Sequence, residues 1–410
     1  MKKRYISLFI AMILLLGIVG GCSSKEAKTT SELTYQQALE KAKGTTVNIY
    51  MWGGSQYVNE YMDTYVKKEL KKEYDIELKR IPVEDIKDTI NKIGQEKKAG
   101  KNNSSVDLIW LNGENFKSAK KDQLLEKNWL SKLPNYESYV DKNVGSIAYD
   151  FGEPIGNMEA PFGRAQFVLV YDSEKVKNPP KSAAELKEWV KQNPGKFTYP
   201  SIPDFTGSAF VRNILMDLDL EGKFQQDGFT EDEFKEASLK TSKYLQEIEP
   251  YLWREGKTYP ENSSKLDKLY STGEVYMTMS YNPFHAMNNI KSGVFKSSSR
   301  TLLLDRGTLS NTHYLSIPFN SSNKEGSLVV ANFLMSPEAQ IKKLDPKVWG
   351  DGTVLEIDRL DSKYVDEIKK MDFTEASVSQ EELQYRALSE IKSEYVDILE
   401  AIWNEEVLKK

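Results

Sequence analysis

Four short segments carry the residues best suited to bind a small polar molecule. They are Trp52–Ser55 (WGGS), Asn112–Asn115 (NGEN), Phe205–Ser208 (FTGS) and Tyr281–Phe284 (YNPF). Between them they offer aromatic rings for stacking, amides and hydroxyls for hydrogen bonds, and one carboxylate. Their small residues let a ligand approach the backbone, and a helix that begins beside them presents free N–H groups. The chemistry indicated is capture of a small solute.

Each candidate also has a structural interpretation. Trp52 could pack in a core, Glu114 could serve the first turn of a helix, and Phe205–Ser208 could be an ordinary helix start. Trp349 could equally well lie in the core or contact the ligand. The predicted ligand-binding residues are Trp52, Gly53, Gly54, Ser55, Asn112, Glu114, Asn115, Arg164, Tyr199, Asp204, Thr206, Gly207, Ser208, Tyr281, Asn282, Phe284 and Trp349.

Catalytic and metal chemistry have little support in the residue types. The chain lacks G-x-S-x-G, H-E-x-x-H and P-loop motifs, so an exported hydrolase is a weak alternative. His285 and His313 are the only histidines and Cys22 the only cysteine, which argues against zinc. We therefore expect no catalytic residue, no metal and no cofactor.

The elements that must position these segments alternate between strand and helix. Strands are predicted at 47–51, 77–81 and 106–111, each followed by a turn and an amphipathic helix. Such alternation implies a mostly parallel sheet, with ligands at the carboxyl ends of its strands. Both WGGS and NGEN follow a strand in this way.

The apolar run at 167–171 reads as a strand that crosses from one lobe to another, after which the pattern repeats. Further strands are predicted at 196–199, 275–279, 301–304 and 314–318. The tail from Ser379 to Leu408 is predicted to be helical. With 410 residues, the chain is too long for one typical core.

The N-terminus indicates export. Residues 1–21 have the cations, short apolar run and small residues of a signal sequence, and the run is too short to span a bilayer comfortably. The sequence Val19-Gly20-Gly21-Cys22 resembles the lipobox of bacterial lipoproteins, which implies lipidation of Cys22. Residues 22–44 would then form a tether, with a short helix capped by Thr34 and Gln37.

Charge argues against nucleic acid as a partner. The full chain has 56 basic and 61 acidic residues, a net charge of −5. Removing residues 1–21 leaves 53 basic residues and a net charge of −8, and no basic patch stands out.

Longer stretches resemble a known family. They are PFGRAQFVLVYDSEKVKNPPKSAAEL from Pro161, KFTYPSIPDFTGSAF from Lys196 and GEVYMTMSYNPFHA from Gly273. Together with WGGS, DLIWLNGENF and the late Ala401-Ile402-Trp403, their order resembles bacterial extracellular solute-binding proteins of ABC importers. The fold type is that of maltose- and thiamine-binding proteins, and the nearest branch is an uncharacterised, thiamine-like one.

The resemblance implies an α/β, two-lobe periplasmic-binding-protein type II fold with two hinge-crossing strands, 161–168 and 300–304. One lobe would comprise residues 45–165 and 304–345, and the other 166–303 and 346–410. The implied function is a monomeric, membrane-anchored protein on the extracellular or periplasmic side. It would pass a solute to an ABC permease with a cytoplasmic ATPase. The aromatics with Glu114 and Asp204 favour a cationic, thiamine-like solute; a sugar, an oxyanion or a role as a solute sensor stay open.

Overall fold

The computed structural model describes residues 34–409, apart from 112, 226–227 and 372–374. The predicted signal sequence, Cys22 and the first part of the tether lie outside the described residues, as does Asn112. Helix α2 (Tyr35–Ala42) has the predicted capping box and packs on α14 (Lys324–Leu334), where Lys41 pairs with Glu325 at 3.0 Å. None of the described helices combines the length and apolar character needed to cross a membrane.

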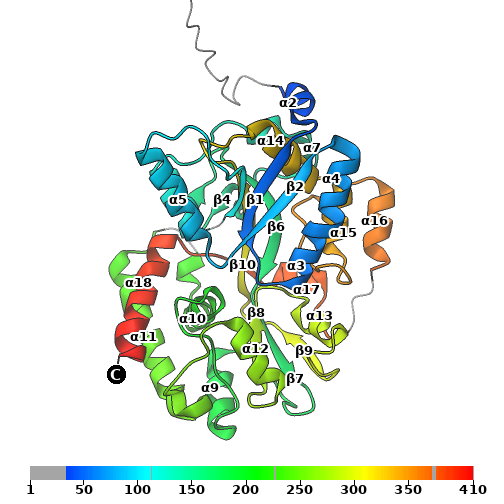
Figure 1. Ribbon diagram of the computed structural model, residues 1–410. Coiled ribbons are helices and arrows are strands. Elements are labelled where there is room, and N and C mark those ends of the chain that lie inside the picture. The colour runs from blue at the N-terminus through cyan, green and yellow to red at the C-terminus, as the bar shows by residue number, and fades with distance from the viewer. Residues whose placement is uncertain (1–33, 112, 226–227, 372–374, 410) are drawn as a thin grey trace, which may run out of the picture.

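The upper lobe in Figure 1 is built on parallel strands, as predicted. Strand β1 (Thr46–Trp52) pairs in parallel with β2 (Glu77–Val83) and with β3 (Leu108–Leu111). Alternate residues of β1 are buried because successive side chains point to opposite faces. The connections and following helices are α3 (Gln56–Glu60), η2 (Tyr61–Val66), α4 (Lys67–Tyr74), α5 (Ile86–Lys98), α6 (Glu114–Lys121), η3 (Leu130–Lys132), α7 (Pro134–Tyr139) and α8 (Gly145–Ala148), followed by the hairpin β4 (Tyr149–Asp150) and β5 (Glu153–Pro154).

Two strands run from this lobe into the lower one. Strand β6 (Glu159–Gln166) carries Phe162 in the first core and leads to Phe167 in the second. Strand β10 (Thr308–Ser316) is antiparallel to β6 and to β3, and places Tyr314 in the first core and Leu309 in the second. The second crossing strand was predicted at 300–304, but the strand that crosses between the lobes is β10, which begins at Thr308.

The lower lobe has an antiparallel sheet. Strand β7 (Val168–Asp172) lies between β8 (Met277–Ser280) and β9 (Ser299–Leu302), so the parallel pattern of the first lobe does not repeat. The strand predicted at 196–199 is wrong: the segment is irregular, although Phe197 and Tyr199 are buried. The helices are α9 (Ala183–Gln192), α10 (Phe205–Leu218), η4 (Lys223–Gln225), α11 (Glu231–Ile248), η5 (Glu249–Tyr251), η6 (Trp253–Gly256), α12 (Ser263–Ser271) and α13 (His285–Lys291).

The C-terminal segment divides differently from the prediction. Trp349, Leu355 and Tyr364 pack in the first core, so this part does not belong with the second lobe. The described chain joins the second core at Ala376, and the predicted helical tail is interrupted by β11 (Ala387–Ser389), which pairs with β10. The other elements are α15 (Pro337–Leu344), η7 (Ile357–Arg359), α16 (Ser362–Lys369), α17 (Gln380–Tyr385), α18 (Ser393–Trp403) and η8 (Asn404–Leu408).

A buried ionic cluster holds the returning segment against β6. Lys343 donates to Asp351 and to the Gly352 carbonyl oxygen at 2.7 Å, and the His313 ring lies 3.0 Å from the same carboxylate. The lysine side chain is fully buried, and its burial is compensated by the adjacent negative charge. A Cβ atom on Gly163 would lie 1.9 Å from Asp351 Oδ2, so only glycine fits beside the cluster.

We predict that Gly163→Ala destabilises the protein by roughly 3–5 kcal/mol, the usual cost of separating a buried ion pair. Urea unfolding would measure it. The control is Gly145→Ala, since Gly145 has an ordinary φ and a Cβ there would meet nothing within 4 Å. Equal stability of the two variants would contradict the role assigned to the cluster.

Candidate functional site

The tip of the β4–β5 hairpin reaches from the first lobe into the second. Phe151 has a φ of 46°, uncommon outside glycine, and its ring belongs to the second core. Its carbonyl oxygen accepts from the Ser393 N–H at 3.3 Å, at the start of α18. On the other side, a Cβ on Gly113 would lie 3.3 Å from the Phe151 ring, and the Gly113 N–H donates to Asp150 Oδ2 at 2.7 Å. The hairpin thus links the NGEN segment to the second lobe.

Aromatic rings of the second lobe continue from Phe151. The centroid of the Phe205 ring lies 6.4 Å from that of Phe151 and 4.9 Å from that of Tyr281. The Arg212 guanidinium lies 5.8 Å from the ring centroids of both phenylalanines. Phe205 is 42% exposed, so this group of rings also presents apolar surface to solvent. Two predicted segments, FTGS and YNPF, therefore meet here.

A buried polar network supports the rings. Arg212 Nε donates to Glu390 Oε2 at 3.1 Å, its Nη1 donates to Ser208, and Tyr281 donates to the same glutamate. Ser208 in turn donates to Glu400 of α18. Burial opposes a charged Arg212, but the Glu390 carboxylate raises the pKa of the guanidinium above its ordinary value. The Arg212 guanidinium, the buried cation of this network, is therefore held in an ion pair with Glu390.

Carboxylates from both lobes lie near the contact between α6 and α18. Glu114 begins α6 of the first lobe, whereas Asp397 and Glu400 lie on α18 of the second. Partial burial of its carboxyl group, followed by the charges of Asp397 and Glu400, raises the pKa of Glu114. Lys117 pairs with Glu394 at 2.5 Å and so offers little neutralisation. Lys87 opposes this rise in the pKa of Glu114, and Asp85 adds to it.

The WGGS segment joins β1 to α3, but residues 53–55 are irregular and do not form the predicted tight turn. Trp52 is 45% exposed, and a Cβ on Gly54 would lie 2.3 Å from its ring, so the indole lies against the Gly54 backbone. The Gly53 N–H donates to the Val83 carbonyl oxygen, and Ser55 makes no capping hydrogen bond to α3. Trp52 is therefore outside the core and free to stack on a ligand.

A second contact between the lobes lies at α13. Tyr57, just after WGGS, donates to the Asn288 carbonyl oxygen at 2.6 Å. The Asn288 side chain donates to the Trp349 carbonyl oxygen at 2.8 Å, and the Asn282 side chain approaches the same oxygen at 3.5 Å. Asn282 thus lies at the boundary between lobes, but its amide is directed to protein.

Several predicted site residues have structural roles instead. Tyr199, Phe284 and Trp349 were predicted to contact ligand, but their side chains are almost fully buried in the core. Tyr199 and Trp349 pack on other aromatic rings, and Phe284 packs closely on the backbone of Gly350. Asp204 caps α10, because its carboxylate accepts hydrogen bonds from the N–H groups of Thr206 and Gly207. These three groups are therefore already hydrogen-bonded within the protein. The Arg164 backbone pairs with Gly352, whereas its buried Nε has no hydrogen-bond partner within the described part of the chain. Asn115 is half-buried in α6, and the binding roles predicted for Arg164 and Asn115 stay predictions. Among the described residues, no group of three or more His, Cys, Asp or Glu could hold a metal ion.

The residues that sequence reasoning missed come from distant segments. They are Phe151, Arg212, Glu390, Asp397 and Glu400. Phe151 stands in a short hairpin without periodicity, and Glu390 lies where the tail was predicted to be helical. The Phe151-Gly152 pair at a turn was the one local signal available. The other four look like ordinary residues of helices or connections, and only the fold brings them together.

Under the NGEN segment lies an unusual buried acid. Glu159 of β6 is fully buried, and neither of its carboxylate oxygens has a hydrogen-bond partner within the described part of the chain. Burial, with a further contribution from Asp150, raises the pKa of Glu159 well above its ordinary value, while Lys120 opposes the shift. The pKa of Asp150 is raised in the same way. Glu159 is thus favoured in its neutral form.

Comparison with known proteins agrees with this architecture. Residues 65–356 match the model of the family described as bacterial extracellular solute-binding protein. The chain is 37% identical over 341 residues to Protein YnjB of Escherichia coli K12, which covers 83% of this chain and 87% of the relative. The chain therefore belongs to the bacterial extracellular solute-binding proteins.

Solved structures show the fold more broadly. A periplasmic thiamin binding protein aligns with a TM-score of 0.58 at 18% identity, covering 88% of this chain and 96% of its own. A putative spermidine/putrescine ABC transporter from Listeria monocytogenes gives 0.61 at 14% identity, covering 89% and 99%. An ABC transporter from Clostridium perfringens gives 0.59 at 18% identity, covering 88% and 99%. The predicted type II two-lobe fold is confirmed.

We predict that Glu159→Gln stabilises the protein at neutral pH. A raised folded-state pKa means that the stability associated with protonated Glu159 is present below the ordinary pKa of about 4.5 and is lost as pH rises through the folded-state pKa. Glutamine does not titrate, so the substitution should raise the free energy of unfolding by up to about 3 kcal/mol at pH 7. This gain should vanish below pH 4.5.

Urea unfolding at several pH values checks this. Glu188→Gln, at an exposed i,i+3 pair with Lys191, serves as control and should show little change. A constant or negative effect of Glu159→Gln across the pH range would refute the interpretation.

Proposed function

We propose that the chain captures a small organic cation between its two lobes and delivers it to an ABC permease driven by a cytoplasmic ATPase. The predicted lipid on Cys22 would hold a monomeric protein on the outer face of the bacterial membrane, and no catalytic step is required. The observation that carries the choice of solute is the set of carboxylates, Glu114 from one lobe and Asp397 and Glu400 from the other. A cation between them removes a repulsion that the free protein retains.

The mechanism follows from where the charges lie. With no solute, Glu114 of α6 repels Asp397 and Glu400 of α18, although the Lys117–Glu394 pair joins the same two helices. A bound cation attracts both sides and shifts the population toward the closed form. The exposed rings of Trp52 and Phe205 would contact an aromatic or cationic part of the solute, with roughly 0.5–2 kcal/mol for a cation over a ring. The crossing strands β6 and β10 provide the hinge.

The relatives support the class of solute without fixing it. Two of the aligned structures are named for thiamin and for spermidine/putrescine, both organic cations. Another is named for bound fructose-6-phosphate, so the fold alone accommodates an anion. The carboxylates, and the commitment of Arg212 to Glu390, argue against a sugar phosphate or another oxyanion here. A neutral sugar and a role in sensing remain alternatives to be tested.

A thermal-shift screen tests the proposal directly. We expect stabilisation by thiamine or polyamines and none by oxyanions; ligand at 100 times its dissociation constant adds about 2.7 kcal/mol. Hits confined to sugars or anions would overturn the proposed solute class.

With a cationic hit in hand, Glu114→Gln should weaken binding by about tenfold, the usual effect of losing a charge-assisted contact. Affinity for the cation should also fall as pH is lowered through the raised pKa of Glu114, because protonation removes the charge. Calorimetry measures both. The exposed Glu188→Gln variant should bind as the parent does, and a pH-independent affinity would contradict the role of Glu114.

Trp52→Ala should weaken binding of the same solute more than Trp253→Ala. The Trp253 ring centroid lies 4.2 Å from the Arg254 guanidinium, and Trp253 Nε1 donates to Glu274 Oε2 at 3.1 Å. These contacts are within the second lobe and involve none of the carboxylates Glu114, Asp397 and Glu400. The two tryptophans therefore form a matched pair. Equal losses, or a larger loss at Trp253, would show that WGGS does not contact the solute.

A further inference from the structure

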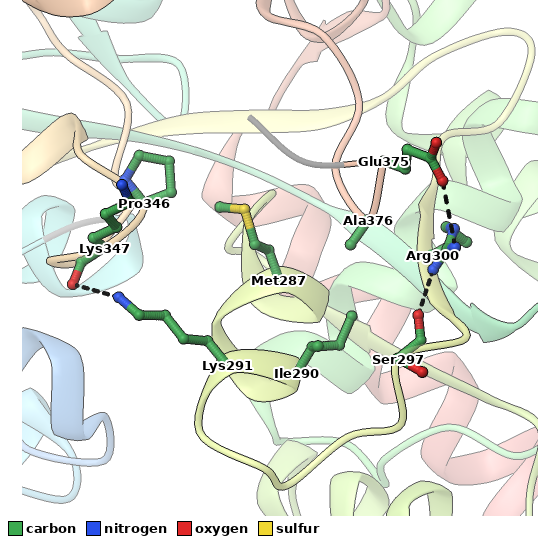
Figure 2. Close-up of a pocket in the computed structure, with 9 residues that line it drawn as sticks. All are labelled: Met287, Ile290, Lys291, Ser297, Arg300, Pro346, Lys347, Glu375 and Ala376. Carbon is green, nitrogen blue, oxygen red and sulfur yellow. Dashed lines mark hydrogen bonds and ion pairs between the residues drawn. The ribbon is translucent and has the colours of Figure 1, made fainter. Parts of the chain in front are cut away.

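A separate cavity of about 390 Å³ opens beside α13 (Figure 2). Four segments line it. Met287, Ile290 and Lys291 come from α13, Ser297 precedes β9, and Arg300 lies in β9. Pro346 and Lys347 follow α15 of the first lobe, and Glu375 and Ala376 belong to the segment returning to the second. Its volume falls within the range of small-molecule sites.

The charge of this cavity is opposite to that of the carboxylate site. Figure 2 shows Lys291 extended toward Lys347, and its Nζ donates to the Lys347 carbonyl oxygen at 3.4 Å. Arg300 donates to the Ser297 carbonyl oxygen at 2.7 Å and lies 3.7 Å from Glu375. That glutamate side chain is 91% exposed, so its neutralising effect is screened by water. The rim thus carries net positive charge.

The floor of the cavity is apolar. Met287 is 8% exposed, and Ile290 and Pro346 continue the surface between the cations. A site with apolar walls and a few placed charges selects a molecule with an apolar body and a group of opposite charge. Inorganic phosphate would leave the floor uncovered, and a cation would be repelled.

We propose that this cavity is a second binding site, for a small organic anion with an apolar body, distinct from the carboxylate site. The walls belong to both lobes, since Lys291 and Arg300 lie on the second and Lys347 on the first. The Asn288–Trp349 contact between the lobes lies next to it, one residue from Met287 and two from Lys347. Lys291 of the second lobe already contacts the Lys347 backbone of the first, so an anion that draws the Lys291 ammonium from this carbonyl oxygen is coupled to the relative position of the lobes.

Calorimetric titration with phenyl phosphate, without any other solute, tests the site. Saturable binding is expected, with much weaker binding of inorganic phosphate and none of benzylammonium. Lys291→Glu and Lys347→Glu should each weaken phenyl phosphate by about tenfold or more, because each lobe supplies one cation. Lys98→Glu and Lys265→Glu, at exposed helix positions elsewhere, make the same charge change and should leave binding intact.

A second variant keeps the charges and fills the space. Ile290→Trp occupies the cavity and should abolish binding of phenyl phosphate while the protein stays folded by circular dichroism. Absence of saturable binding to the parent protein, unchanged affinity in both lysine variants, or equal affinity for inorganic phosphate would each overturn the proposal. None of these results depends on the carboxylate site, so the two proposals fail separately.

Discussion

The close packing of β6 against a buried ionic cluster is the constraint on which the rest of the structure depends. Gly163 leaves no room for a Cβ beside Asp351, Lys343 and His313, and the next residue pairs through its backbone with Gly352. The cluster therefore fixes the returning segment against the crossing strand. Two residues before Asp351, the Trp349 carbonyl oxygen accepts from Asn288 of the other lobe. A packing requirement in one core thus influences how the lobes meet, because the Trp349 backbone that contacts the other lobe belongs to the segment that the cluster fixes.

The distribution of charge then separates the two sides of the interlobe boundary. At the carboxylate site, Arg212 is held by Glu390, so the remaining carboxylates decide the sign of the potential. At the cavity beside α13, two lysines and an arginine surround an apolar floor, and the single carboxylate is exposed to water. Complementary charge gives selectivity more than raw affinity. The two proposed sites would therefore select solutes of opposite charge.

Much of the fold was predictable because its signals are local. The alternating burial of β1, the capping box at Thr34 and the apolar run of β7 all follow from short-range patterns. The strand predicted at 196–199 failed because an apolar run is buried equally well without sheet pairing. The carboxylate site was only half predictable: the turns NGEN and FTGS were found, but Glu390 was not. Its partner Arg212 is 178 residues away, and no local pattern encodes such a contact.

The central claim is that a cation draws the two lobes together, and small-angle X-ray scattering tests it most directly. The chain from Ser23 onward would be measured with and without a saturating cationic solute, and the radius of gyration compared. We expect the radius of gyration to be smaller with solute than without it. In a variant in which Glu114, Asp397 and Glu400 are all neutralised, we expect the solute to leave the radius of gyration unchanged. Tight binding with an unchanged radius, or the same contraction in that variant, would contradict it.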